Sequence, residues 1–104
     1  MNYKLRYLPI AEDDLDRLAG YLTRFYPHTA AKVLGQMEEQ LSRLQDFPEM
    51  CEEYHPDPFF RKMVVDDYVL FYHVNDVLRS VDVYRVLRGS WNLKHYLSNT
   101  THED

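Results

Sequence analysis

The stretch YRVLRGSWN, residues 84–92, brings two arginines, a tyrosine and the only tryptophan of the chain into nine positions. Guanidinium groups bind phosphate and carboxylate oxygens through paired hydrogen bonds, and aromatic rings stack on bases or fill pockets of partner proteins. The stretch therefore suits three roles: holding a phosphate in an active site, binding a macromolecular partner, or joining a strand to a helix.

The strand-like pattern before Gly89 predicts on which face each of these side chains lies. Strict alternation turns four side chains toward covering helices, namely Val81, Val83, Arg85 and Leu87. It turns four to the opposite side, namely Asp82, Tyr84, Val86 and Arg88. Because the first set is mostly apolar, we predict that Arg85 lies beneath the helices and forms a structural ion pair with Asp13 or Asp14. The alternative for Arg85 is direct contact with a phosphate or a partner.

The opposite side of that strand carries the candidate binding surface. Tyr84 and Arg88 are expected there, and Arg61 and Lys62 of an earlier apolar run would join them in a basic patch that contacts RNA or a protein target. Trp91 has three open roles: stacking on a base, anchoring a partner, or holding the last helix against the sheet edge.

The net charge of −5 at pH 7 is unevenly distributed along the chain. Residues 1–58 hold six basic and eleven acidic side chains, whereas residues 59–98 hold six basic and four acidic ones. Because nucleic-acid binding relies on clustered cations, this balance argues against a general nucleic-acid binder. A local basic patch in the second half of the chain remains compatible with it.

Cys51 is the only cysteine, which excludes an intramolecular disulfide, and no cysteine–histidine spacing indicates zinc. We therefore expect no metal and no cofactor. No stretch approaches the length of an apolar membrane span, so a cytoplasmic protein without a membrane partner is expected.

Changes in hydrophobic period divide the chain into seven elements. An alternating run predicts a strand, and apolar residues at intervals of three and four predict two consecutive helices. Three strand-like runs follow, separated by Asp-Asp and Asn-Asp breaks, and a short helix comes last. The expected ranges are 3–9, 10–25, 26–48, 60–65, 68–74, 78–87 and 91–97.

These elements predict an α+β fold in the order β-α-α-β-β-β-α. The short connection between the two helices makes them an antiparallel hairpin on one face of a four-stranded, mainly antiparallel sheet, and the other face stays more open. Gly35, inside the second helix, indicates a close approach of the two helices. We expect a single domain at residues 1–98 and a polar tail at residues 99–104 that frays.

The element order and several stretches resemble the RelE/ParE family of toxins from type II toxin–antitoxin systems, the plasmid stabilisation type. The stretches are YLPIAEDDLDRLAGYL, LQDFPEM, FRKMVVDDYVLFYHV and VYRVLRGSWNLKHYL. The last is the most specific, because it keeps Arg85, Val86, Leu87 and Gly89 of the family pattern and has Arg88 where histidine is common. The run RVLRGS and the long helix hairpin are closer to the ParE-like branch.

The resemblance implies one of two activities on one fold. ParE-like toxins are associated with inhibition of DNA gyrase, and RelE-like toxins are metal-independent endoribonucleases that cleave mRNA at the ribosome. The central arginine of RelE-like enzymes falls at Val69 in this chain, which argues against cleavage. His95 and Tyr96, however, are similar to the endings of some ribonuclease toxins and remain candidates for contact with RNA or a target.

The sequence therefore favours a toxin that inhibits growth by binding a macromolecular target, with DNA gyrase as the target that the resemblance implies. Two alternatives stay open: ribosome-dependent mRNA cleavage, and a weakly active or inactive member that acts in an antitoxin complex. The alternative of a weakly active or inactive member arises because toxins of this family are often strongly basic and this chain is not. A cognate antitoxin is the expected partner in each case, and no catalytic residue is assigned.

Overall fold

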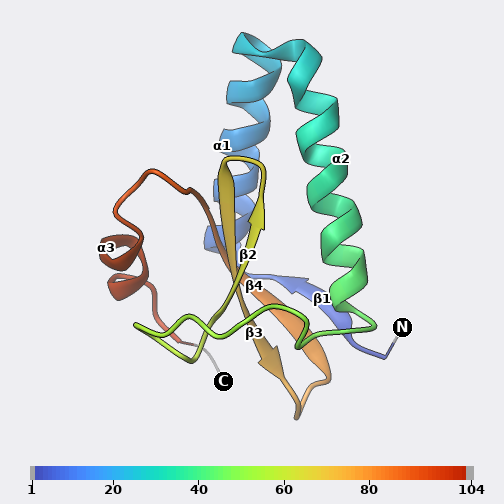
Figure 1. Cartoon of the computed structure of the whole chain (residues 1–104), viewed down its shortest axis with the longest axis vertical. Coiled ribbons are helices and arrows are strands. Elements are labelled where there is room, and N and C mark those ends of the chain that lie inside the picture. Colours follow the sequence, from blue (N-terminus) through green and yellow to red (C-terminus); the bar gives the residue numbers. More distant parts are fainter. Residues whose placement is uncertain (1, 103–104) are drawn as a thin grey trace.

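The computed structural model describes residues 2–102 and contains seven elements in the predicted order (Figure 1). They are β1 (Lys4–Tyr7), α1 (Pro9–Phe25), α2 (Pro27–Leu44), β2 (Arg61–Val65), β3 (Tyr68–Asn75), β4 (Ser80–Arg88) and α3 (Leu93–Ser98). The predicted α+β class and the order β-α-α-β-β-β-α are confirmed.

The four strands form one sheet in the order β1-β4-β3-β2. The pairs β2–β3 and β3–β4 are antiparallel, and β1 runs parallel to β4 at one edge. The prediction of a mainly antiparallel sheet is therefore confirmed. The helix hairpin connects the two edge strands, because it follows β1 and leads through a long loop to β2 (Figure 1).

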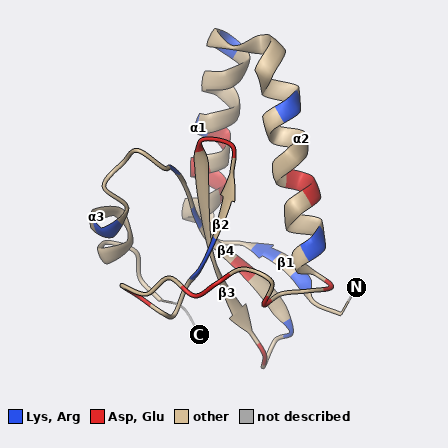
Figure 2. Cartoon of the chain, viewed as in Figure 1, with Lys and Arg blue, Asp and Glu red and all other residues tan. Residues whose placement is uncertain are grey.

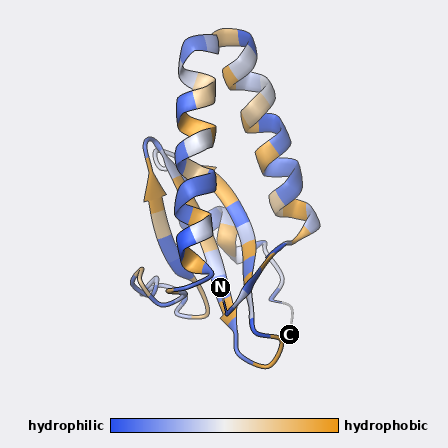
Figure 3. Ribbon diagram, turned by 90° about the vertical axis from the view of Figure 1, so that its right-hand side faces the viewer, coloured by the Kyte–Doolittle hydropathy of each residue, from blue (hydrophilic) through white to orange (hydrophobic). Residues whose placement is uncertain are grey.

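The helices α1 and α2 cover one face of the sheet with their apolar stripes (Figure 3). Buried side chains recur every three or four residues along both helices, as expected of amphipathic helices that pack on a sheet. They are Ala11, Leu18, Leu22, Ala30, Val33, Met37, Leu41 and Leu44. The main core forms where these side chains meet the sheet.

The two helices do not approach each other closely at Gly35. Apart from its chain neighbours and the backbone of its own helix, a Cβ atom built on Gly35 would meet no atom within 4 Å, and the residue lies on the exposed side of α2. The predicted reason for this glycine is therefore wrong. The free end of the hairpin extends beyond the sheet (Figure 1), so the helices there are held by fewer contacts with the rest of the chain.

A β-bulge in β4 changes which side chains face the helices. The register with β3 shifts between Phe71, which is opposite Arg85, and Tyr72, which is opposite Val83, so that Tyr84 is the extra residue. Val83 and Val86 consequently both join the core under the helices. Strict alternation predicted Val86 and Arg88 on the opposite face and Leu87 under the helices. These predictions are wrong, because the bulge reverses the pattern after Tyr84: Leu87 joins the second core and Arg88 contacts Tyr21 of α1.

The second face of the sheet is covered rather than open, which corrects the prediction made for it. A smaller core lies there, with side chains from the sheet, from the loop before β2 and from α3. Its buried members are Leu8, Phe60, Val69, Phe71, Tyr84, Leu87 and Leu97. The central strands carry apolar side chains on both faces, so the second face also needs a cover.

The first part of the predicted tail packs on this cover. Thr100 is buried, and its hydroxyl donates a hydrogen bond to the carbonyl of Tyr96 at 2.9 Å. The ring of His102 stacks on Phe59 with 3.8 Å between ring centres, and its Nε2 lies 3.0 Å from a carboxylate oxygen of Asp57. Residues 99–102 thus hold α3 to the loop before β2, whereas residues 103–104 lie outside the described part of the chain.

Candidate binding cleft

Arg85 and Asp14 form a two-point ion pair between β4 and α1. Asp14 accepts hydrogen bonds from Arg85 Nε at 2.8 Å and Nη2 at 3.1 Å, and its Oδ2 also accepts one from the backbone N–H of Val86 at 2.9 Å. Both side chains are less than 10% exposed. Asp13, the other predicted partner, is exposed to solvent. The structure therefore pairs Arg85 with Asp14. The prediction that Arg85 faces the core under the helices is wrong, because after the bulge Arg85 lies opposite Phe71, whose side chain belongs to the second core.

The positions of both residues follow from their elements. Asp14 lies on the same buried side of α1 as Ala11 and Leu18, three and four residues away, so it points at β4. The remaining nitrogen of Arg85, Nη1, donates to the hydroxyl oxygen of Thr100 at 3.4 Å, and the guanidinium lies 5.6 Å from the ring centre of Tyr96. Each of the three nitrogen atoms of the Arg85 guanidinium thus donates a hydrogen bond within the fold.

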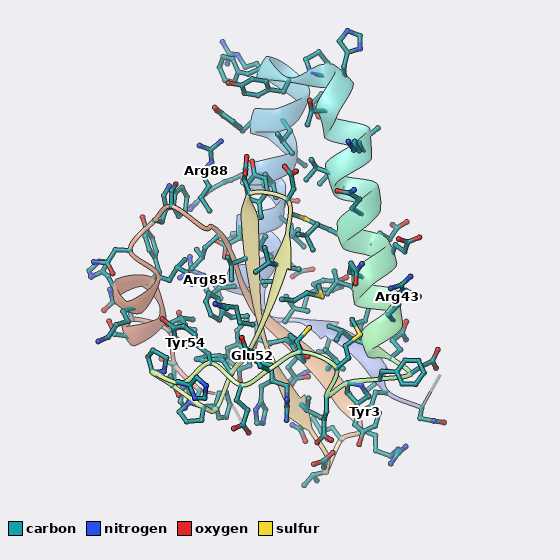
Figure 4. All side chains as sticks on the ribbon, in the orientation of Figure 1. Tyr3, Arg43, Glu52, Tyr54, Arg85 and Arg88 are labelled. Atoms are coloured by element: carbon teal, nitrogen blue, oxygen red, sulfur yellow. The ribbon has the colours of Figure 1, made fainter. Side chains whose placement is uncertain are left out.

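A cleft of about 490 Å³ opens beside this ion pair, between α1, the end of β4 and the segment that carries α3. Asp14 and Arg85 form part of its lining. The side chains that give the rest of the cleft its chemistry are Arg17, Tyr21, Tyr68, Arg88, Trp91 and Tyr96. In Figure 4, Arg85 lies between the sheet and α3, and Arg88 lies further along β4 toward the free end of the hairpin.

Arg88 is held by two tyrosines at the helix side of the cleft. Its guanidinium lies 5.1 Å from the ring centre of Tyr21 on α1 and 5.9 Å from that of Tyr68 on β3, the range of cation–π contacts. A hydrogen bond with the Tyr68 side chain raises the pKa of Arg88 above its usual value. Arg88 is therefore a fixed cation that presents its hydrogen-bond donors at the cleft.

Trp91 and Tyr96 form the wall of the cleft opposite α1. Their rings stack with 5.2 Å between centres and 25° between planes, and Trp91 is 45% exposed. The side chain of Asn92 caps α3 by accepting a hydrogen bond from the backbone N–H of His95 at 3.2 Å. Trp91 therefore precedes the helix, which was expected to begin at this residue, and its outer ring face is free to meet a partner.

The predicted basic patch does not form. Tyr84 is 1% exposed and packs in the second core, on the face of the sheet opposite to Arg88. Arg61 donates to the carbonyl of Cys51 at 2.6 Å, and the backbone N–H of Lys62 is bonded to the same loop. Arg61 is paired with Tyr72 of β3, whereas Arg88 is paired with Tyr68, four residues away along the same strand. The two arginines therefore do not lie next to each other.

His95 is exposed on α3 and contacts Tyr96 edge-on.

Sequence reasoning missed Arg17, Tyr21 and Tyr68. A signal existed for the first two, because residues three and four apart on a helix share a side, and Asp14, Arg17 and Tyr21 follow that spacing. The register of the β3–β4 hairpin places Tyr68 opposite Arg88, but that register depends on a bulge that strict alternation cannot reveal.

The cleft can bind an anion together with an apolar group. Its lining has three arginines, four aromatic rings, no histidine and one carboxylate, that of Asp14, which is already bound to Arg85. An adjoining hollow of about 470 Å³, on the other side of Arg88, is lined by Asp66 and Asp67.

Within residues 2–102, no cluster of three potential metal ligands is present, and no helix is both long and apolar enough to cross a bilayer.

Comparison with known proteins identifies the family. Residues 5–93 match the model of the ParE toxin of type II toxin–antitoxin systems, parDE. The chain belongs to this ParE toxin family. The matched range covers all of the four strands except the first residue of β1, both helices of the hairpin and most of the cleft lining, so the toxin class applies to the domain described above. A search of curated protein sequences finds no match.

Solved structures of ParE and RelE toxins share this fold. A chromosomal ParDE system from P. aeruginosa has a TM-score of 0.68 at 19% identity, covering 84% of this chain and 96% of that one. An E. coli RelE mutant in complex with an antitoxin RelBc peptide has a TM-score of 0.69 at 19% identity, covering 100% of both chains. The RelBE2 toxin–antitoxin complex of Mycobacterium tuberculosis has a TM-score of 0.59 at 21% identity, covering 85% of this chain and 99% of that one. These similarities concern the fold.

Proposed function

We propose that this ParE family toxin arrests growth by binding DNA gyrase through the cleft between α1, β4 and α3. A cognate antitoxin neutralises the toxin by binding it. Because DNA gyrase acts on the chromosome, the proposal places the toxin in the cytoplasm. The observation that carries the proposal is the state of the cleft arginines: Arg85 is paired with Asp14 and also donates to Thr100, and Arg88 is held between two aromatic rings.

This arrangement supports binding rather than bond cleavage. RNA cleavage through a 2′-hydroxyl needs a base, an acid for the leaving oxygen and cations that stabilise the developing charge. The lining of the cleft has no histidine, and its single carboxylate, Asp14, accepts three hydrogen bonds. Val69, where RelE-like enzymes carry their central arginine, lies in the second core. A surface with fixed cations and exposed rings is instead typical of protein recognition.

A supercoiling assay with purified toxin and DNA gyrase tests the proposal. The wild-type toxin is expected to inhibit supercoiling of a relaxed plasmid, and Arg88→Ala is expected to weaken inhibition, because it removes the cation held at the cleft. Lys32→Ala is the matched control, since Lys32 is an exposed cation on α2 outside the cleft lining. Unchanged supercoiling at a large molar excess of wild-type toxin would contradict the proposal.

A second measurement separates the two activities of the family. Primer extension on cellular mRNA after induction of the toxin is expected to show no new cuts while growth stops. Cuts that depend on a translating ribosome would instead assign the chain to RNA cleavage. Normal growth after induction without an antitoxin would identify an inactive member.

A further inference from the structure

The free end of the helix hairpin carries positive charge and no carboxylate. Residues 17–37 contain Arg17, Arg24 and Lys32 but neither aspartate nor glutamate, although the whole chain has a net charge of −5. Figure 2 shows blue without red at this end of α1 and α2, and red on both helices nearer to the sheet. A basic surface is therefore present on the hairpin, whereas the one predicted on the strands does not form.

Two arginines of this segment lie on the same side of α1, with Tyr21 between them. Residues three or four positions apart on a helix share a side, so Arg17, Tyr21 and Arg24 follow one another along α1. The two arginines are exposed and stand about 10 Å apart along the helix axis. Arg88 of β4 lies 5.1 Å from the ring centre of Tyr21 and adds a third cation. We call Arg17, Arg24 and Arg88 the arginine row.

The charge of the arginine row is not balanced within the fold. None of its three members forms a salt bridge with a residue in the part of the chain that the structure describes. Asp13 precedes Arg17 by one turn of α1, and Asp66 and Asp67 line the hollow next to Arg88. Because these carboxylates border the row at its end nearer the sheet, the row is open to an anion that extends toward the free end of the hairpin.

Duplex DNA matches the extent of this charge better than an acidic protein segment does. The phosphates of one strand follow each other about every 3.4 Å along the axis of the duplex. Arginines that stand about 10 Å apart can therefore contact phosphates of one strand that are about three positions apart. Arg24 belongs to the last turn of α1, at the end of the hairpin that protrudes beyond the sheet (Figure 1), so a long rigid anion can reach it.

The aromatic rings beside the row favour a duplex over a single strand. Tyr21 lies 5.2 Å from Phe25 and 5.8 Å from Tyr26 between ring centres. The guanidinium of Arg24 lies 5.3 Å from the ring centre of Phe25. The rings thus pack on one another and against arginines. Unpaired bases need free ring faces on which to stack, whereas the backbone of a duplex needs hydrogen-bond donors, which the guanidinium groups supply.

We propose that the arginine row binds the phosphate backbone of duplex DNA without reading its sequence. Contacts with phosphates fix the position of a protein on DNA but carry no direct sequence information. The inference goes beyond the proposed function and does not depend on it, because the toxin binds DNA by itself in this proposal. Arg24 lies outside the lining of the cleft, so its substitution separates contacts with DNA from contacts made by the cleft.

Fluorescence anisotropy of a labelled DNA duplex of about 20 base pairs, titrated with the full-length toxin, tests the inference. The logarithm of the affinity is expected to fall with the logarithm of the salt concentration with a slope of about −3, because three arginines displace counterions. Arg17→Gln and Arg24→Gln are each expected to weaken binding about tenfold at about 50 mM salt and to reduce the slope by about one.

Arg43→Gln is the matched control for these variants. Arg43 is an exposed arginine at the opposite end of α2 (Figure 4), and its substitution is expected to leave the dissociation constant within about twofold. A duplex of the same length and unrelated sequence is expected to bind equally well, because the row contacts only phosphates. Circular dichroism of each variant establishes that it is folded.

Four results would overturn the inference. The first is a wild-type toxin that does not bind the duplex at low salt, and the second is an unchanged dissociation constant and salt slope in the double variant R17Q/R24Q. The third is tighter binding of a single strand of the same length, which would assign the surface to unpaired bases. The fourth is displacement of the duplex by a polyglutamate peptide of equal charge, which would assign it to an acidic protein.

The outcome is independent of the supercoiling assay. DNA binding that Arg24→Gln weakens, without inhibition of DNA gyrase by the wild-type toxin, supports this inference and removes the proposed target. Inhibition of DNA gyrase by a toxin that does not bind DNA does the reverse.

Discussion

Asp14 and Arg85, 71 residues apart in the sequence, join the first helix to the last strand through two hydrogen bonds of 2.8 and 3.1 Å. The same carboxylate also accepts a hydrogen bond from the backbone N–H of Val86, close to the bulge. A side chain of α1 therefore provides the acceptor for this backbone donor of β4. The pair lies at the cleft, and its two charges are committed to each other. It fixes the distance between α1, which carries Arg17 and Tyr21, and β4, which carries Arg88.

Substitution of Arg85 by alanine is expected to lower the free energy of unfolding by about 3 to 5 kcal/mol, the usual cost of leaving one partner of a buried ion pair unpaired. Urea unfolding followed by circular dichroism measures the loss. The double variant D14A/R85A is expected to lose less than the sum of the two single variants. Arg17→Ala, an exposed control in the same cleft, is expected to stay within about 0.5 kcal/mol of the wild type. If Arg85→Ala also changed the free energy of unfolding by no more than about 0.5 kcal/mol, the ion pair would not contribute to stability as expected.

Tyr84→Ala is expected to behave as a core variant and not as a binding variant. Tyr84 packs edge-on against Phe59 and Phe60 at 5.6 and 5.2 Å between ring centres and is 1% exposed. Truncation of a buried aromatic residue costs about 3 to 5 kcal/mol. Arg88→Ala, by contrast, is expected to change stability by less than about 1 kcal/mol. Thermal unfolding of both variants checks this, and full stability of Tyr84→Ala would contradict the position of the residue in the core.

The elements of the fold were predictable because their local signals agree with their tertiary roles. Apolar residues at helical spacing define the buried stripes of α1 and α2, and Pro9 and Pro27 stand at the first positions of these helices, where a missing N–H has no cost. The pairing of Arg85 with a carboxylate was also predictable from the apolar neighbours of Arg85. A cation among such neighbours needs a counter-charge.

The position of the cleft was not predictable, because it depends on two features without a local signal. The extra residue at Tyr84 breaks the two-residue period, and nothing in the sequence of β4 marks a bulge. The second face of the sheet is closed by Phe59 and Phe60 from a loop rich in proline, whereas connecting loops ordinarily run over the surface of a protein. These two features move Tyr84 into the interior and Arg88 to the helix side.

Stability in acid is expected to depend on Asp82, which is fully buried at the other end of β4. Burial by itself raises the pKa of Asp82, but hydrogen bonds from Arg6 and Ser80 outweigh it and hold the pKa below its usual value. A carboxylate with a lowered pKa stabilises the fold above its unfolded pKa of about 3.9, and this contribution is lost as the pH falls below that value toward the pKa of the folded state.

Asp82→Asn is the variant that tests this pH dependence. It is expected to lower the free energy of unfolding by about 1 to 3 kcal/mol at pH 7, because it removes the charge that Arg6 pairs with. It is also expected to flatten the fall in stability as the pH drops below about 4. Urea unfolding at several pH values measures both effects. An equally steep fall in the variant would assign the acid sensitivity to other carboxylates.

Gly35→Ala is expected to stabilise the protein. Gly35 lies in the interior of α2 on its exposed side, and a Cβ atom added there meets nothing within 4 Å. Alanine is more favourable than glycine inside a helix by about 1 kcal/mol, and no steric clash offsets this gain. Ala31→Gly, at an exposed position of the same helix, is the reverse control and is expected to lose a similar amount. Denaturant unfolding of the two variants measures both changes, and a loss of stability in Gly35→Ala would mean that the helices do meet at this residue, as the sequence alone predicted.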